Sequence, residues 1–154
     1  MINRIKALFD GLTEKSAPDA SLFKDRHVAT AALLVEAASL DGAFDESEAA
    51  TIRDILDRYF DFTPEEIDSL IAEGREMAAD SNQIVNFTRA LKDACDESER
   101  VAMMEMLWEV AYADGELHDY EANLMRRVAG LLYVGDRESG AARKRALERL
   151  GIDV

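Results

Sequence analysis

The sequence predicts an all-α protein, a compact bundle of about seven helices. Apolar residues recur at helical spacing through most of the chain, as in helices that bury one face. Alanine, leucine, glutamate, arginine and methionine are common, whereas proline occurs only twice, so the composition favours helix throughout. A chain of 154 residues with 48% hydrophobic residues can bury one core, which indicates a single globular domain.

Residues 1–20 are predicted to form an amphipathic segment and a linker. Residues 1–9 place apolar side chains at helical spacing beside two basic ones, and Gly11, Ser16 and Pro18 follow. The apolar stripe could make a peripheral contact with a membrane. So short a helix binds lipid weakly, however, and packing on the protein's own domain is favoured.

A helical domain is expected over residues 21–135. Its first helix runs over residues 21–40 and its second over residues 46–59, each with an apolar stripe. His27 is interpreted as a packed ring, because no cysteine or second histidine stands at metal-ligand spacing nearby. Thr63 begins a third helix, with proline in the first turn and glutamate at the third helical position.

The remaining helices are expected to begin at Ser81, at Asp96, after a second acidic turn, and near Arg137. Cys95 is interpreted as a small core residue, because nothing around it supplies the positive charge that makes a reactive thiolate. Residues 136–154 form a basic C-terminal helix. This helix could dock on an acidic partner, an anionic membrane or the protein's own acidic surface, but a solvated helix is favoured.

One stretch of the sequence occurs twice. Residues 36–48 and residues 109–121 each begin and end with glutamate and hold Asp-Gly at the sixth and seventh positions. The apolar positions that follow the two stretches also match. The repeated unit is therefore a hairpin made of a helix, a short acidic turn and a second helix.

Helix capping accounts for part of this repeat. Gly42 and Gly115 are suited to end a helix, because glycine takes the left-handed conformation without penalty. Asp45 and Glu48 form a capping box at the start of the next helix. Residues 96–99 repeat the same tetrapeptide with no Asp-Gly before it, so the capping box itself needs no functional explanation.

The aspartates before the two glycines are harder to explain. Asp41 and Asp114 would lie at the C-terminal ends of their helices, where the helix dipole disfavours an anion by about 0.3 to 1 kcal/mol. Each could close an Asx turn or accept hydrogen bonds from the following helix. Alternatively, a bound cation could neutralise four carboxylates together, those of Asp41, Glu48, Asp114 and Glu121. The sequence leaves both explanations open.

Topology is expected to bring the two turns to one end of the bundle. An even number of helices separates them, so with short up-and-down connections both open on the same side. Carboxylate oxygens suit Ca²⁺, Mg²⁺ or Mn²⁺, while His118, at the position that matches Asp45, could draw in Zn²⁺. Asp45 and His118 are therefore secondary candidates, as are Glu36 and Glu109, which are expected on a different and exposed helix face. A basic group of a partner could occupy the same patch, and no organic cofactor is expected.

Charge and motifs exclude several classes of protein. A formal net charge of −14 argues against nucleic-acid binding, because phosphates would repel most of the surface. The turns lack the alternating ligands of an EF-hand, and the sequence holds no Glu-x-x-His pair, nucleophile elbow or phosphate-binding loop. The protein is therefore not expected to be an enzyme. A single cysteine and the lack of an apolar leader or membrane span predict a cytoplasmic protein.

The duplicated hairpin resembles the tellurite-resistance TerB family. The resemblance rests on residues 38–48 and residues 111–121 and covers about residues 22–134. It implies a compact all-helical fold, an acidic surface that binds divalent metal, and a role in bacterial stress response or in membrane-linked signalling complexes. Relatives include the N-terminal domain of a membrane-anchored DnaJ-like co-chaperone. The repeated acidic positions of the family are matched by Asp41, Glu48, Asp114 and Glu121.

Three hypotheses of function follow from these residues. The favoured one is a non-catalytic TerB-like module that binds a divalent cation through the two acidic turns. The second is a protein-interaction module in which the turns are structural and a terminal segment contacts an unknown protein partner. The third is metal-dependent hydrolysis at the same carboxylates, which would require an open coordination position and a pocket.

Overall fold

Seven helices and no strand make up the described part of the chain, residues 25–40, 44–80 and 84–152 of a computed structural model. This finding confirms the predicted all-α bundle. The segment and linker predicted over residues 1–20 lie outside the described residues, as do Asp41, Gly42 and Ser81. In chain order, the helices are α2 (Asp25–Ala38), α3 (Glu46–Tyr59), α4 (Pro64–Asp80), α5 (Ile84–Ala94), α6 (Glu97–Ala111), α7 (Asp119–Leu131) and α8 (Asp136–Leu150).

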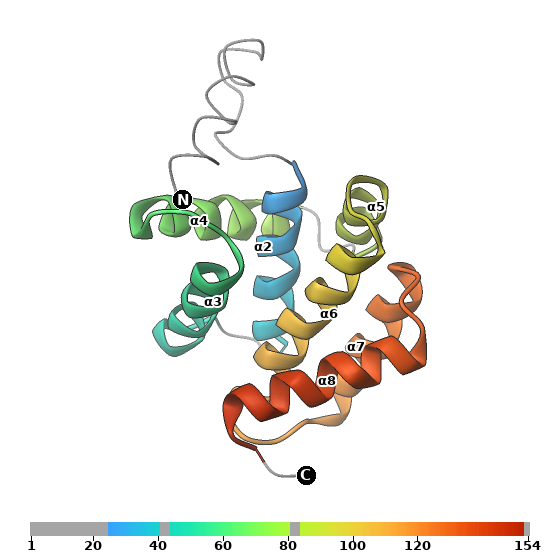
Figure 1. Cartoon of the computed structure of the whole chain (residues 1–154). Coiled ribbons are helices and arrows are strands. Elements are labelled where there is room, and N and C mark those ends of the chain that lie inside the picture. Colours follow the sequence, from blue (N-terminus) through green and yellow to red (C-terminus); the bar gives the residue numbers. More distant parts are fainter. Residues whose placement is uncertain (1–24, 41–43, 81–83, 153–154) are drawn as a thin grey trace.

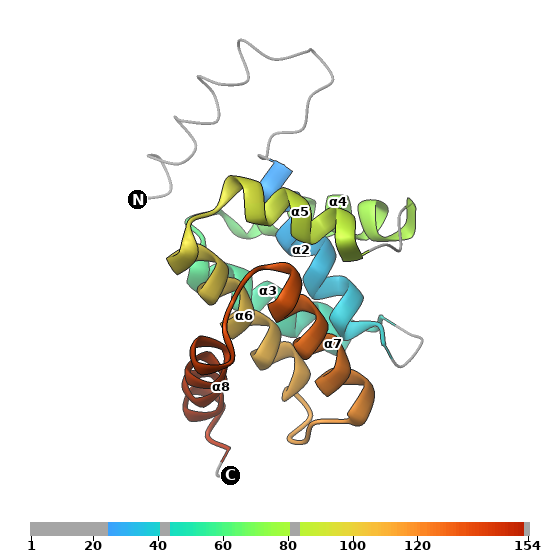
Figure 2. The same ribbon diagram turned by 90° about the vertical axis from the view of Figure 1, so that its right-hand side faces the viewer.

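Helices α2 and α6 form the centre of the bundle (Figure 1). Helix α2 packs against α3, α4, α5 and α6, and α6 also packs against α7 and α8. Figures 1 and 2 show α4 and α5 toward one end of the molecule and α8 toward the other. Because neighbours surround α6, every residue from Met103 to Tyr112 is buried.

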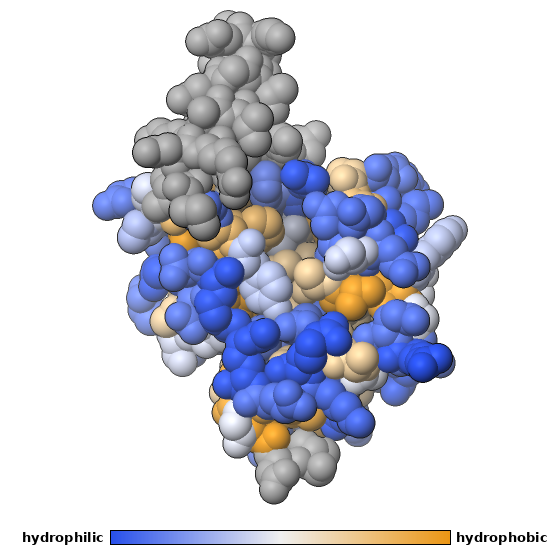
Figure 3. Space-filling view, in the orientation of Figure 1, coloured by the Kyte–Doolittle hydropathy of each residue, from blue (hydrophilic) through white to orange (hydrophobic). Residues whose placement is uncertain are grey.

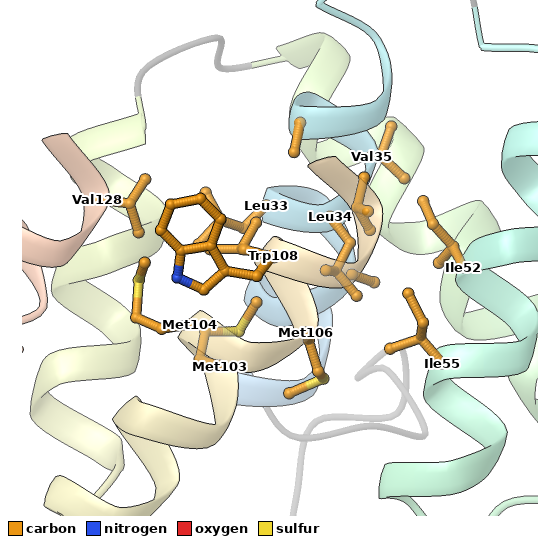
Figure 4. Close-up of a cluster of buried hydrophobic side chains, with 14 of the residues drawn as sticks. Leu33, Leu34, Val35, Ile52, Ile55, Met103, Met104, Met106, Trp108 and Val128 are labelled. Atoms are coloured by element: carbon orange, nitrogen blue, oxygen red, sulfur yellow. The ribbon is translucent and has the colours of Figure 1, made fainter. Parts of the chain in front are cut away.

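The core gathers the apolar stripes that the sequence predicts. Hydrophilic side chains cover most of the face seen in Figure 3, whereas leucine, isoleucine and methionine side chains of several helices meet inside (Figure 4). Among the predicted core residues, Met104, Leu107 and Trp108 of α6 are at most 9% exposed. Their burial confirms that the methionine and tryptophan stripe belongs to the core. None of the described helices is long and apolar enough to cross a membrane.

Helix α4 crosses α2 at close range. Gly74 of α4 lies against the α2 backbone: a Cβ atom at Gly74 would stand 2.6 Å from the Cβ of Ala31 and 2.9 Å from the backbone nitrogen of Ala32. Residues this small on both helices allow the two backbones to approach closely. The glycine therefore serves the packing of the two helices, which outweighs its low helix propensity.

Capping boxes begin three of the helices, as the sequence predicts. At each start, the side chain of the N-cap residue accepts a hydrogen bond from the backbone of the third helical residue, whose glutamate accepts one in return. The hydrogen bonds to the N-cap side chains measure 2.9 Å at α3, 3.1 Å at α4 and 2.8 Å at α6. The pairs are Asp45 and Glu48, Thr63 and Glu66, and Asp96 and Glu99.

The second acidic turn differs from the prediction at its glycine. Helix α6 ends at Ala111, so Gly115 lies beyond the helix rather than at its first left-handed position. The Gly115 N–H donates to the carbonyl of Tyr112 at 2.9 Å, and Gly115 has a φ of 98°, a conformation that favours glycine. Asp114 is therefore part of a turn and lies outside the last helical turn, which weakens the predicted repulsion by the helix dipole.

His27 and Cys95 are packed residues, as predicted. The ring of His27 is 7% exposed and meets the rings of Phe60 and Phe62 edge-on, at centroid distances of 5.2 and 5.4 Å. Cys95 is half-buried against the core, and burial raises the pKa of its thiol. A raised pKa keeps this thiol protonated near neutral pH, in agreement with a structural role. The expectation that no positive charge surrounds Cys95 is wrong, because Arg26 and Arg100 lie near it, but burial outweighs their effect on the pKa.

Helix α8 is not the solvated helix that the sequence favours. It packs along α6 and buries Ala142, Ala146 and Leu147. Two of its arginines, Arg145 and Arg149, reach carboxylates of α6. The basic C-terminal helix thus docks on the protein's own acidic residues, one of the alternatives to a solvated helix, because its small apolar face fits against α6.

Candidate functional site

A cavity of about 170 Å³ opens where the two hairpins meet. It lies between the C-terminal ends of α2 and α6 and the N-terminal ends of α3 and α7. The helix ends on either side of the first acidic turn therefore lie beside the second acidic turn. We call this cavity the acidic cleft, and its lining residues are Ala38, Leu40, Ser47, Glu48, Thr51, Val110, Ala113, Asp114, His118, Tyr120 and Glu121.

Glu48 and Glu121 occupy matching positions on the two sides of the acidic cleft. An oxygen of Glu48 accepts a hydrogen bond from the backbone N–H of Asp45 at 2.9 Å, and an oxygen of Glu121 accepts one from the N–H of His118 at 2.9 Å. Each carboxylate thus stands over the first turn of a helix, where the helix dipole stabilises an anion. Their negative charges are compatible with the fold even without a bound cation.

Asp114 and His118 form a second pair in the cleft. One oxygen of Asp114 accepts from the backbone N–H of Glu116 at 3.1 Å, which is the Asx turn that the sequence analysis considers. The other oxygen lies 3.2 Å from Nε2 of His118. The His118 ring is stacked on the Tyr120 ring, with a centroid distance of 5.4 Å and an angle of 2° between the planes.

The carboxylates around His118 change its titration. The pKa of His118 is raised above its ordinary value of 6.5, first by the hydrogen bond with Asp114 and further by the charges of Glu121 and Glu116. The protonated ring can donate to Asp114, whereas a metal ion would need the neutral ring. A zinc ion at this nitrogen would therefore compete with a proton.

The other candidate residues lie apart from the cleft or outside the described chain. Asp41 lies outside the described residues. In the sequence it directly follows Leu40, which lines the cleft. Asp45 caps α3 and is not in the lining. Glu36 is half-buried on α2, and burial raises the pKa of its carboxyl. Within residues 25–40, 44–80 and 84–152, no three histidine, cysteine or acidic side chains are arranged to hold a metal ion.

Glu109 is the clearest departure from the sequence prediction. Its side chain is expected to be exposed, but it is only 1% exposed and pairs with two arginines. Arg58 of α3 lies 2.5 Å from one of its oxygens, and Arg149 of α8 lies 2.7 Å from the other. Because both oxygens of Glu109 are paired with arginines, its side chain links three helices and we do not expect it to bind a cation.

Glu105, one helical turn before Glu109, completes this ion-pair cluster. Its oxygens accept hydrogen bonds from Arg145 at 2.6 Å, from Arg149 at 2.8 Å and from the Tyr59 hydroxyl at 2.8 Å. Burial opposes ionisation of Glu105, but these donors outweigh it and lower the pKa of the carboxyl. The predictions from the sequence do not include this cluster, although two glutamates four positions apart on a mostly apolar helix are a visible signal.

Residues 27–144 match the family described as Tellurite resistance protein TerB. The match covers well over half of the 154 residues and includes both acidic turns and the helices around them. No curated protein and no solved structure matches the chain.

Proposed function

The chain belongs to the TerB family, and on this premise we propose that its acidic cleft binds a divalent cation without catalysing a reaction. The observation that carries the proposal is that carboxylates from both hairpins line one cavity. Glu48 comes from the first hairpin, and Asp114 and Glu121 come from the second. Three carboxylates in a cavity of about 170 Å³ make a strongly negative site that a divalent cation would neutralise.

The chemistry of the donors favours a hard cation. Carboxylate oxygens are the preferred ligands of Ca²⁺, Mg²⁺ and Mn²⁺, and waters commonly fill their remaining positions. His118 would contribute a nitrogen to Zn²⁺ only when its ring is neutral. No three histidine, cysteine or acidic side chains of the described residues are arranged to hold a metal ion, so the proposal includes Asp41, the acidic residue that follows Leu40 in the sequence.

The role of such a site is best understood as recognition. A bound cation would change the charge of the cleft, and with it the surface that a protein partner meets. The family description favours a bacterial stress response of the tellurite-resistance type, and we place the protein in the cytoplasm or beside a membrane-linked signalling complex.

A protein-interaction module with structural turns is the second candidate. The capping boxes and the Asx turn favour it, because each gives a carboxylate of the cleft a hydrogen-bonded role without a cation. Hydrolysis is less well supported. The cleft is concave, as a hydrolase would require, but small-molecule sites usually measure about 300 to 1,000 Å³, and the cleft is smaller.

Thermal unfolding of the chelator-treated protein tests the proposal. Ca²⁺, Mg²⁺, Mn²⁺ or Zn²⁺ should raise the melting temperature, because a ligand that binds only the folded state stabilises it. The variant Asp41→Asn with Asp114→Asn should fold and lose this rise. Asp57→Asn with Asp93→Asn, which removes two exposed carboxylates elsewhere, should retain it. An unfolded turn variant, or no rise in the wild type, would instead favour the structural role of the turns.

A further inference from the structure

A second cavity, of about 320 Å³, lies apart from the acidic cleft. It is formed by the first turns of α2, the end of α3, the end of α5 and the first half of α6. Patches of hydrophobic surface interrupt the hydrophilic residues on the face that these helices share in Figure 3. We call it the arginine pocket, and its lining includes Arg26, Phe60, Leu91, Arg100, Met103 and Met106.

Part of the wall of the arginine pocket is apolar and packed into the core. Leu91, Met103 and Met106 are each less than 5% exposed, and the Phe60 ring is fixed edge-on against His27. Methionine side chains adapt their shape to a ligand more readily than branched ones. A cavity of this volume, with such walls, falls within the range of small-molecule sites.

Two arginines line the pocket, although the chain as a whole is acidic. The lining holds Arg26 and Arg100 against a single carboxylate, Glu99, in a protein with a net charge of −14. Glu99 is already engaged: one oxygen caps α6 by accepting from Asp96 N–H at 2.9 Å, and the other lies 3.4 Å from Arg26. The carboxylate therefore does not cancel both guanidinium groups.

The arginines leave most of their hydrogen-bond donors unused by the described residues. A guanidinium group has five N–H donors. Arg26 uses one on Glu99, and Arg100 uses one on the carbonyl of Cys95, at 2.7 Å. The Nε atom of Arg100 is buried with no hydrogen-bond partner in the described chain. A buried guanidinium N–H without a partner among the described residues favours an anion that can accept its hydrogen bond.

We propose that the arginine pocket binds a small organic anion, a carboxylate with an apolar body. The carboxylate accepts hydrogen bonds from Arg26 and Arg100, and the apolar body contacts Phe60, Leu91 and the two methionines. This site is separate from the acidic cleft in position and opposite in charge. Its existence does not depend on cation binding there.

Calorimetric titration of the full-length protein with octanoate tests the proposal, with neutral octanol as the matched probe. Octanoate should bind saturably at one site, and octanol should bind at least about tenfold more weakly, the ratio expected for a charge-assisted hydrogen bond. Arg26→Gln with Arg100→Gln should weaken octanoate binding about tenfold or more. Arg53→Gln with Arg137→Gln removes as much positive charge elsewhere and should leave octanoate binding unchanged.

Arg100 also holds the end of α5, so Arg26→Gln alone serves as a second variant that keeps this contact. A third, Ala102→Trp, fills the pocket and should abolish binding of both probes. The proposal is overturned if the wild type shows no saturable octanoate binding, if octanol binds equally well, or if folded Arg26→Gln and Ala102→Trp bind octanoate as the wild type does.

Discussion

Two buried glutamates of α6 form ion pairs with other helices that the sequence does not indicate. Glu105 and Glu109 lie on the most enclosed helix of the bundle, where an unpaired carboxylate would be strongly destabilising. Arg149 contacts both of them, at 2.8 and 2.7 Å, and its guanidinium also lies over the Tyr59 ring. Among the described ion pairs, Arg149 is the residue of α8 that joins both glutamates, so we expect the packing of α8 on α6 to depend on it.

Arg149→Met should lower the free energy of unfolding by about 1 to 3 kcal/mol. The substitution keeps much of the aliphatic stem but removes the hydrogen bonds to two buried carboxylates, and such bonds to charged groups have this magnitude. Urea denaturation measures the change. Arg137→Met on the same helix, where the side chain is exposed, is the control and should change stability little. Equal effects of the two substitutions would contradict the structural role of Arg149.

His118 should titrate above its ordinary pKa, and Asp114 should be the main cause. A pKa that is higher in the folded than in the unfolded state stabilises the protein below the unfolded value, and this contribution is lost as pH rises through the folded value. NMR titration of the two histidine rings measures the shift, with the signals assigned by His27 and His118 variants. Asp114→Asn should bring the pKa of His118 down toward 6.5, and an unchanged pKa would show that the hydrogen bond does not form in solution.

The starts of the helices agree with the local sequence pattern, whereas the end of α6 does not. The capping boxes of α3, α4 and α6 form as predicted, because each involves groups only three positions apart. The end of α6 is different, since Gly115 closes a turn outside the helix. Glycine can take a positive φ both at the end of a helix and in a turn beyond it, so the sequence alone does not distinguish these two arrangements.

Gly74→Ala should destabilise the protein by about 1 to 3 kcal/mol, although alanine is the better helix former by about 1 kcal/mol. The added methyl group would meet the backbone of α2 at 2.9 Å, which neither helix can relieve by a change of rotamer. Gly130→Ala is the matched control, because its Cβ atom would meet nothing within 4 Å, and it should be neutral or stabilising. Both effects are read from chemical denaturation, and a stabilising Gly74→Ala would contradict the close crossing of α2 and α4.

The global fold could be predicted because its signals are local and repeated. The helical period of the apolar residues predicts the seven described helices, and the even number of helices between the turns predicts that Glu48 and Glu121 meet in one cleft. The ion-pair cluster could not be predicted. Glu109 is compensated by residues 51 and 40 positions away, so its burial depends on contacts that a pattern along the chain does not contain.

The arginine pocket could not be predicted from the sequence either. Its lining comes from the ends of four helices, and no motif links Arg26 to Arg100 in the sequence. The net charge of −14 describes the chain but not the lining of this pocket, which holds two arginines and one glutamate. Opposite local charges at two separate cavities are a property of the folded molecule only.

The most direct test of the cation proposal is the number of ions that one chain binds. Calorimetric titration of the chelator-treated protein should give one site, and Glu48→Gln or Glu121→Gln alone should each weaken binding about tenfold or more. Glutamine keeps the capping hydrogen bond but removes the charge, and Glu99→Gln, at the same capping position of α6, is the control that should bind normally. Two independent sites, each lost with one substitution, or no binding by the wild type, would contradict a single cation site shared by the two acidic turns.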